Sequence, residues 1–254
     1  DSSAAINPSA TEACDGVDND CDGTQLAAEL EDLDLDGEPD CQTCEQAGYW
    51  SAAEDLSGDD LVSALHTASA GVICRYSDAT DEMFLYMDKV NGYVTGVYTG
   101  IEVPVGDEKP DAEVMNTEHS WPQSKGADKE PAKCDLHHLF PTDSEANSIR
   151  GNDPFGIVMG SPTWSAGGSY YGTSANGQLV FEPRDAHKGV VARAMLYFSI
   201  RYGYTLNSDE LLLYTDWHTA HPVDEVELTR TQHIQEFQGN ANPFVACPEL
   251  VERL

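Results

Sequence analysis

Residues 116–124 read NTEHSWPQS, and they decide the fold together with CDLHHLFPTD at 134–143 and ANSIRGN at 146–152. A neutral histidine such as His119 can take a proton from water near pH 7. The neighbouring carboxylate of Glu118 suits a hard divalent cation, and an asparagine side-chain oxygen suits the same ion. Few protein ligands leave room for water and phosphate oxygens, so this combination indicates metal-assisted hydrolysis of a phosphodiester.

These segments resemble the endonuclease I family, whose members carry a ββα-metal active site. The family pattern is Glu-His-x-Trp-Pro, then Asp-Leu-His-[His/Asn]-Leu-x-Pro, then a helix start that contains Asn with Arg nearby. Further similar segments follow at residues 189–193, 221–225 and 238–245. The resemblance therefore extends over residues 60–254, with the segments in the family's order.

The resemblance implies a role for each matching residue. His119 would be the general base, Glu118 and Asn147 the direct metal ligands, and Arg150 a contact to phosphate or to transition-state charge. His119 would end one strand, residues 135–139 would form the next, and Asn147 would lie on the following helix. The implied ion is Mg²⁺, with Ca²⁺ or Mn²⁺ as alternatives, and the implied products carry a 5′-phosphate.

One departure from the family concerns the positive charge at the site. Some relatives have a longer segment between the first two motifs, and it supplies an arginine. Here only fifteen residues separate His119 from Asp135, and their basic residues are all lysines, Lys125, Lys129 and Lys133. The identity of the transition-state cation stays open. Further candidate phosphate-binding residues are Lys125, Arg184 and Lys188.

The predicted fold class is α+β, with a mixed core around the ββα-metal motif and a small acidic extension before it. We place the extension at residues 1–45 and the catalytic domain at 46–254. Three helices are predicted, at residues 60–70, 188–202 and 222–237. A strand pair is predicted at 83–105, turning at Asn91-Gly92, and a Gly/Ser-rich surface loop at 161–178. The apolar segment 189–202 is interrupted by Arg193 and Arg201 and is interpreted as a buried amphipathic helix, and no segment is long enough to cross a bilayer.

The extension contains two Asp-rich loops that resemble calcium sites. The first has the D-x-[DN]-x-[DN]-G-x5-E spacing of an EF-hand, and the second lacks the closing Glu. The proposed calcium ligands are Asp18, Asp20, Asp22, Glu29, Asp32, Asp34, Asp36 and Asp40. The alternatives are a solvated acidic linker or adaptation to salt.

Seven widely spread cysteines favour disulfides in an oxidising compartment, and hence a secreted or periplasmic protein. Cys41-x-x-Cys44 alone could indicate zinc or redox chemistry, but no second Cys-x-x-Cys or matching His pair accompanies it, so disulfides are favoured over zinc. The chain opens on Asp-Ser-Ser-Ala, which suggests that numbering begins after processing. The odd count means that at least one thiol is free or pairs outside the chain.

The net charge of −32 argues against a nucleic-acid enzyme, because such proteins are usually basic. Residues 1–60 hold 18 of the 45 acidic residues and no Lys or Arg. Either the acidic excess lies away from the active face, or the protein works in high salt, where charges are screened within a few Å.

The expected function is endonucleolytic cleavage of DNA, and possibly RNA, with little sequence preference, by a monomer without a protein or membrane partner. One alternative is a calcium-dependent binding or adhesion protein on an inactive nuclease fold. Another is a phosphodiesterase or phosphatase for small or lipid substrates.

Adaptation to salt makes a prediction about activity. Nicking of a supercoiled plasmid should persist or rise between low and near-molar NaCl, because salt screens the repulsion between the acidic surface and DNA. Ordinary DNA-binding proteins lose affinity steeply over such a series. A steep loss here would contradict the adaptation.

Overall fold

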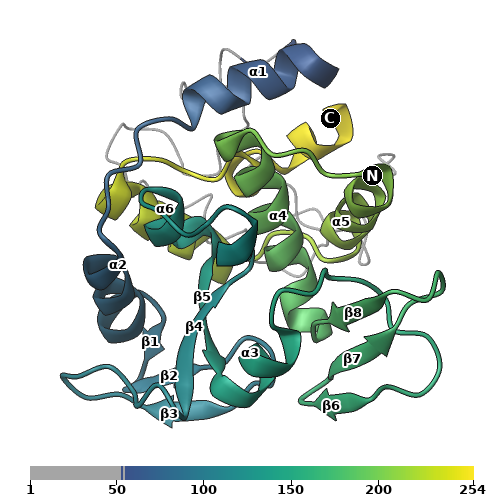
Figure 1. Ribbon diagram of the computed structural model, residues 1–254. Helices are drawn as coiled ribbons and strands as arrows, with labels where there is room; N and C mark the ends of the chain where they lie inside the picture. The colour runs from purple at the N-terminus through teal and green to yellow at the C-terminus, as the bar shows by residue number, and fades with distance from the viewer. Residues whose placement is uncertain (1–52, 54) are drawn as a thin grey trace, which may run out of the picture. The chain divides into compact units, whose positions relative to one another are not determined.

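A ββα unit lies at the centre of the computed structural model, which describes residue 53 and residues 55–254 (Figure 1). Strand β4 (Met115–His119) pairs antiparallel with β5 (Leu139–Asp143), and α3 (Ser144–Arg150) follows directly. The carboxylate of Asp143 accepts the backbone N–H of Ala146 at 2.9 Å and so caps α3. The mixed α+β fold class predicted from the sequence is confirmed.

The register of the β4–β5 pair fixes where the motif residues lie. Glu118 is opposite Phe140, and His119 is opposite Leu139. Segment 135–139 was predicted to be a strand, but residues Leu136–His138 form a 3₁₀ turn (η6) and the strand begins only at Leu139. The turn forms because the Asp135 carboxylate accepts the backbone N–H of His137 at 3.1 Å.

The predicted strand pair at 83–105 is confirmed in part. Strands β1 (Lys89–Val90) and β2 (Tyr93–Thr95) form a hairpin around Asn91-Gly92, where φ is 52° and 82°. Two positive φ angles are what a tight turn of this kind requires. Strand β3 (Glu102–Pro104) extends this sheet. The first part of the predicted segment, Met83–Met87, lies before β1 and is a helical continuation of α2 (Tyr76–Glu82) rather than a strand.

The Gly/Ser-rich segment 161–178 is not a plain loop, contrary to prediction. It contains β6 (Trp164–Ala166) and β7 (Ser169–Thr173), which form a three-stranded antiparallel sheet with β8 (Leu179–Glu182). Gly167 and Gly168 make the β6–β7 turn with φ of 58° and 92°. At Gly167 an added Cβ would lie 2.0 Å from the carbonyl oxygen of Thr99, so glycine is required there.

Helix α4 (Asp185–Tyr202) runs through the middle of the molecule and packs against α1 and α5 (Figure 1). The residues from Val191 to Ile200 are all buried, so the predicted burial of this helix is confirmed, but the helix is enclosed on every side rather than amphipathic. The helix predicted at 222–237 is confirmed as α6 (Glu225–Gln238), and the one at 60–70 as α1. The helices not yet located are α1 (Gly58–Ala68), α2 (Tyr76–Glu82), α5 (Ser208–Ala220) and α7 (Pro243–Ala246).

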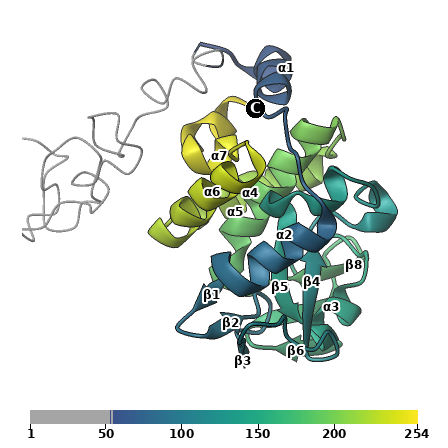
Figure 2. The same cartoon turned by 90° about the vertical axis from the view of Figure 1, so that its left-hand side faces the viewer.

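Three 3₁₀ turns complete the described elements. They are η4 (Gln123–Lys125), η5 (Ala132–Cys134) and η7 (Pro248–Arg253), and the last of these packs against α7 and α5. Helix α2 lies beside the β4–β5 pair in both views (Figure 1 and Figure 2), and a disulfide between Cys74 and Cys134 joins its N-terminal end to η5. No helix among the described residues is long and apolar enough to cross a membrane.

The buried His187 of α4 makes a prediction about stability and pH. Burial lowers its pKa to about 3, while the same residue in the unfolded chain titrates near 6.5. As the pH falls below 6.5 the unfolded state therefore binds the proton first. The free energy of unfolding should fall until the pH reaches about 3, by up to about 1.4 kcal/mol per pH unit.

Urea unfolding of the His187→Gln variant between pH 7 and pH 4 tests this. Its stability should depend less on pH than that of the wild type. The control is His221→Gln, because His221 is only half-buried and its ring makes no hydrogen bond to a described residue. Equal pH dependence in wild type and His187→Gln would contradict the interpretation.

Candidate active site

Glu118 is buried in an ion pair near the end of β4. Its side chain is 1% exposed, and its Oε1 accepts a hydrogen bond from the Tyr98 hydroxyl at 2.7 Å and from Arg150 Nη1 at 2.9 Å. Burial raises the pKa of Glu118, and the charge of Arg150 opposes this. Oε2 makes no hydrogen bond to a described residue.

Arg150 is the ion-pair partner of Glu118 and is 1% exposed. Besides Glu118, its guanidinium donates to the backbone oxygens of His119 at 3.0 Å and Ser120 at 2.7 Å. The guanidinium also stacks over the Phe155 ring at 4.4 Å. The expected contact between Arg150 and a phosphate is not favoured by this geometry, because the guanidinium is enclosed and its hydrogen bonds hold the end of β4.

Asn147 lies on α3, where its amide is held in one orientation. Its Nδ2 donates to Asn116 Oδ1 at 2.7 Å and to the backbone oxygen of Thr117 at 3.2 Å. Because the NH₂ group is used on β4, the amide oxygen is left as an acceptor without a hydrogen bond in the described part of the chain. Asn147 therefore lies against the residue before Glu118, as the ββα arrangement predicts.

His119 is the last residue of β4, and it is buried with 7% of its surface exposed. Its Nε2 lies 3.1 Å from the backbone oxygen of Lys133, and its Nδ1 lies 3.4 Å from the amide of Gln123. A carbonyl oxygen only accepts, so Nε2 carries the proton and Nδ1 keeps its lone pair. Burial, and then the neighbouring His138, lower the pKa of His119 to about 3. The ring is therefore neutral at pH 7.

The two histidines of the second motif support this arrangement from the interior. His138 donates from Nε2 to the oxygen of Ala132 at 2.7 Å, and its ring meets that of His119 edge-on at 5.5 Å. His137 bonds the oxygen of Asn240 at 2.9 Å on the other side. Asp135 is fully buried and accepts from donors that include Gln238, Tyr197 and Tyr202.

The candidate phosphate-binding residues do not form one cluster. Lys125 is exposed, and its segment lies beside the second half of α4, because Trp121 bonds the Lys125 oxygen and stacks on Phe198 at 5.0 Å. Arg184 and Lys188 lie at the other end of that helix. Ten residues separate Lys188 from Phe198, a rise of about 15 Å. Lys188 is also paired with Glu182 and Asp185, both at 2.8 Å.

A family model described as Endonuclease I matches residues 59–249. This chain belongs to the endonuclease I family. It is 33% identical to the extracellular ribonuclease of Bacillus subtilis (strain 168), over 81% of this chain and 77% of that protein. It is 35% identical to an extracellular deoxyribonuclease of Aeromonas hydrophila, over 44% of this chain and 48% of that protein. A second model, described as a putative metal-binding motif, matches residues 1–25.

As an endonuclease of this family, the chain has a sparse ligand set. Among residue 53 and residues 55–254, no group of three or more His, Cys, Asp or Glu side chains is placed to hold a metal ion. That leaves the carboxylate of Glu118 and the amide of Asn147 as the candidate ligands. The proposed calcium ligands, from Asp18 to Asp40, lie outside the described residues, as does the Cys41-x-x-Cys44 pair.

Two members of this endonuclease I site were not found from the sequence. Tyr98 lies 20 residues before Glu118, and no local pattern marks it as a partner of the carboxylate. Tyr76 packs its ring 5.5 Å from that of His119, although it is far away in sequence. Both contacts depend on how β2 and α2 pack against the β4–β5 pair, so only the tertiary structure reveals them.

The buried pair makes a prediction about stability. Arg150→Met should lower the free energy of unfolding by roughly 3–5 kcal/mol, because it leaves the Glu118 carboxylate buried without its partner. Urea unfolding in EDTA, with Lys125→Met as the control on an exposed lysine, measures this. A loss equal to that of the control would contradict the role given to Arg150.

Proposed function

We propose that this endonuclease cleaves nucleic acid by metal-dependent hydrolysis, with Nδ1 of His119 as the general base. The observation that carries this proposal is the contact between His119 Nε2 and the Lys133 carbonyl, which leaves the unprotonated lone pair on Nδ1, where only a long contact of 3.4 Å to the Gln123 amide competes for it in the described part of the chain. Burial keeps the ring neutral at pH 7, which is the form that takes a proton.

Glu118 and Asn147 suit a hard cation as the metal site. Both offer oxygen ligands, Glu118 Oε2 has no hydrogen bond to a described residue, and the Asn147 amide is oriented by its own donors. We favour Mg²⁺, with Ca²⁺ or Mn²⁺ as alternatives, since few protein ligands suit an ion that keeps its waters. The bound cation would neutralise charge that develops on the phosphate during attack.

The chain's own residues would divide the proton and charge chemistry as follows. His119 Nδ1 takes a proton from water, and the water oxygen forms a bond to phosphorus. The bond from phosphorus to O3′ breaks, O3′ receives a proton from solvent, and the product keeps its phosphate on the 5′ side. Arg150 and Tyr98 are positioning residues here, because both hold Glu118 and neither faces solvent.

We infer that DNA and RNA are both substrates, cut with little sequence preference. The relatives support this, since one is named an extracellular ribonuclease and another an extracellular deoxyribonuclease. The same names, with that of a periplasmic deoxyribonuclease, support action outside the cytoplasm.

We further propose that residues 1–45 form a separate calcium-binding extension. The metal-binding model that matches residues 1–25 supports metal binding there.

Removal of the base or the metal should abolish cleavage of a supercoiled plasmid. His119→Ala should lower the rate by about 10²- to 10⁴-fold, as loss of a general base does. EDTA should stop the wild type, and Mg²⁺ should restore it. The matched control is His221→Ala, which removes a half-buried histidine without a hydrogen bond from its ring and should cut like the wild type.

The same assay separates the rival functions. A wild type that cuts neither plasmid nor RNA with any divalent cation would favour a binding protein on an inactive nuclease fold. Cleavage of a small chromogenic diester without cleavage of plasmid would favour a small-molecule phosphodiesterase. Equal rates in wild type and His119→Ala would show that the base is another group.

A further inference from the structure

Five of the thirteen Lys and Arg side chains form ion pairs with acidic partners in the described part of the chain, and all five pairs lie within 3.1 Å. The pairs are Lys109–Asp81, Arg150–Glu118, Lys188–Glu182, Arg193–Glu227 and Arg230–Asp88. Each of these five cations is thereby largely neutralised.

Lys133 has no carboxylate in ion-pair range among the described residues, and among the lysines between His119 and Asp135 it alone is half-buried. Its Nζ lies 4.8 Å from the centre of the Tyr76 ring. The Tyr76 ring in turn lies 5.5 Å from the ring of His119, and the Lys133 carbonyl lies 3.1 Å from His119 Nε2. The carbonyl of Lys133 thus contacts His119, and its ammonium lies on the aromatic ring that packs against His119.

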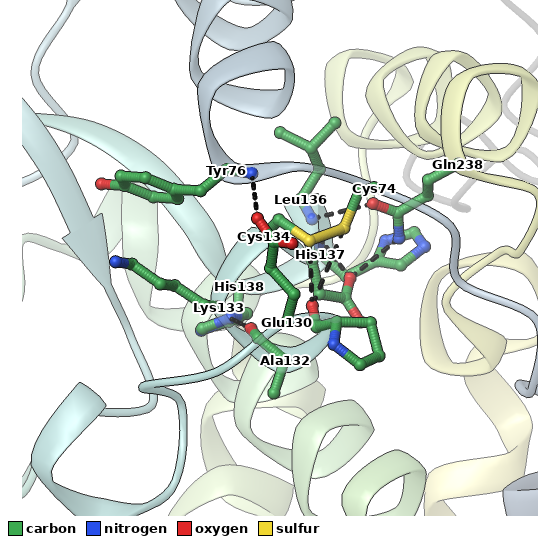
Figure 3. Close-up of a disulfide and its surroundings, with 12 residues drawn as sticks. Cys74, Tyr76, Glu130, Ala132, Lys133, Cys134, Leu136, His137, His138 and Gln238 are labelled. Atoms are coloured by element: carbon green, nitrogen blue, oxygen red, sulfur yellow. Dashed lines mark hydrogen bonds between the residues drawn. A yellow bond between two sulfur atoms is a disulfide. The ribbon is translucent and has the colours of Figure 1, made fainter.

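Tyr76 holds the ammonium without neutralising it. An aromatic face attracts a cation by its quadrupole and accepts none of the three N–H bonds in the way a carboxylate does. Figure 3 shows the side chains of Tyr76 and Lys133 extending together away from the disulfide. The charge of Lys133 therefore stays available to an anion beside His119.

The segment that carries Lys133 is fixed before any substrate arrives. Cys134, the next residue, is bonded to Cys74, two residues before Tyr76 (Figure 3). The backbone N–H of Tyr76 donates to Glu130 Oε1 at 2.9 Å, which joins the same two segments again. A preorganised charge stabilises a transition state best, because no reorganisation is needed when the charge develops.

We propose that Lys133 is the catalytic cation of this enzyme and that its ammonium contacts a non-bridging oxygen of the scissile phosphate. This inference rests on the proposed nuclease function. When water attacks phosphorus, negative charge grows on the non-bridging oxygens, and Lys133 stabilises it through charge-assisted hydrogen bonds. Lys133 gives up no proton in the step. His119 takes the proton of the water, and the departing O3′ is protonated by solvent.

Lys125 and Lys129 lie on the same segment but are exposed and make no side-chain contact with Tyr76 or His119. We assign them to general attraction of the polyanion. This difference supplies a matched pair of variants. Lys133→Met removes the ammonium and keeps the carbonyl that bonds His119, whereas Lys129→Met removes an exposed charge from the same segment.

The experiment measures kcat and KM on a duplex oligonucleotide with Mg²⁺ for the wild type, Lys133→Met, Lys133→Arg and Lys129→Met. Lys133→Met should lower kcat by about 10²-fold, the loss seen when one donor to a developing oxyanion is removed. Lys133→Arg should recover much of it. Lys129→Met should change KM and leave kcat within about 3-fold of wild type, because it acts on binding alone.

Two further readouts separate chemistry from structure. The Kd of a labelled oligonucleotide in EDTA should weaken by a similar factor in Lys133→Met and Lys129→Met. With sulfur in place of one non-bridging oxygen, one of the two diastereomers should reduce the kcat penalty of Lys133→Met, since the contact is already weakened. A merely structural role would give equal penalties on all substrates.

The outcomes are distinct. A wild type that cuts while Lys133→Met keeps the kcat of Lys129→Met overturns the role of Lys133 and leaves the nuclease function standing. Equal penalties on oxygen and sulfur substrates also overturn it, because a direct contact is then absent. A wild type that does not cut overturns both proposals together.

Discussion

The buried ion pair between Glu118 and Arg150 is the interaction on which the rest of the site depends. Two charges taken out of water are stabilised by their mutual attraction and by further hydrogen bonds. Here Arg150 reaches from α3 to the carboxylate and to two backbone oxygens at the end of β4, and Tyr98 adds a fourth contact, while Arg150 Nε is buried without a partner among the described residues. The same network therefore orients one carboxylate oxygen and fixes the strand end from which His119 projects.

A second set of contacts holds the imidazole of His119. The carbonyl of Lys133 sets which ring nitrogen carries the proton, and the rings of Tyr76 and His138 close two sides of His119. Enclosure by these groups lowers the pKa of the ring and keeps it neutral at pH 7. The Cys74–Cys134 disulfide joins the two segments that supply the carbonyl and one of the rings. The disulfide-linked segments thus fix both the orientation of the imidazole and the protonation of its two nitrogens.

The strongly acidic composition is compatible with this site because of how the charges are placed. Residues 1–60 carry 18 acidic residues and no basic ones, whereas the segment between His119 and Asp135 carries three lysines. Five of the other ten Lys and Arg side chains form ion pairs in the described region. Net charge describes long-range attraction, but the field beside a reacting phosphate is set by the few uncompensated groups within a Debye length.

Sequence by itself determined the family, the α+β class, the Asn91-Gly92 hairpin and the order of the motif residues, because these are local patterns read from neighbouring positions. It mistook 161–178 for a loop, since Gly and Ser obscure strands that are stabilised by pairing with β8. Only the tertiary structure decided that Arg150 is enclosed, that Tyr98 holds Glu118, and that Lys133 and Tyr76 flank His119. Those contacts join residues far apart in the chain, and packing between elements, rather than local pattern, sets them.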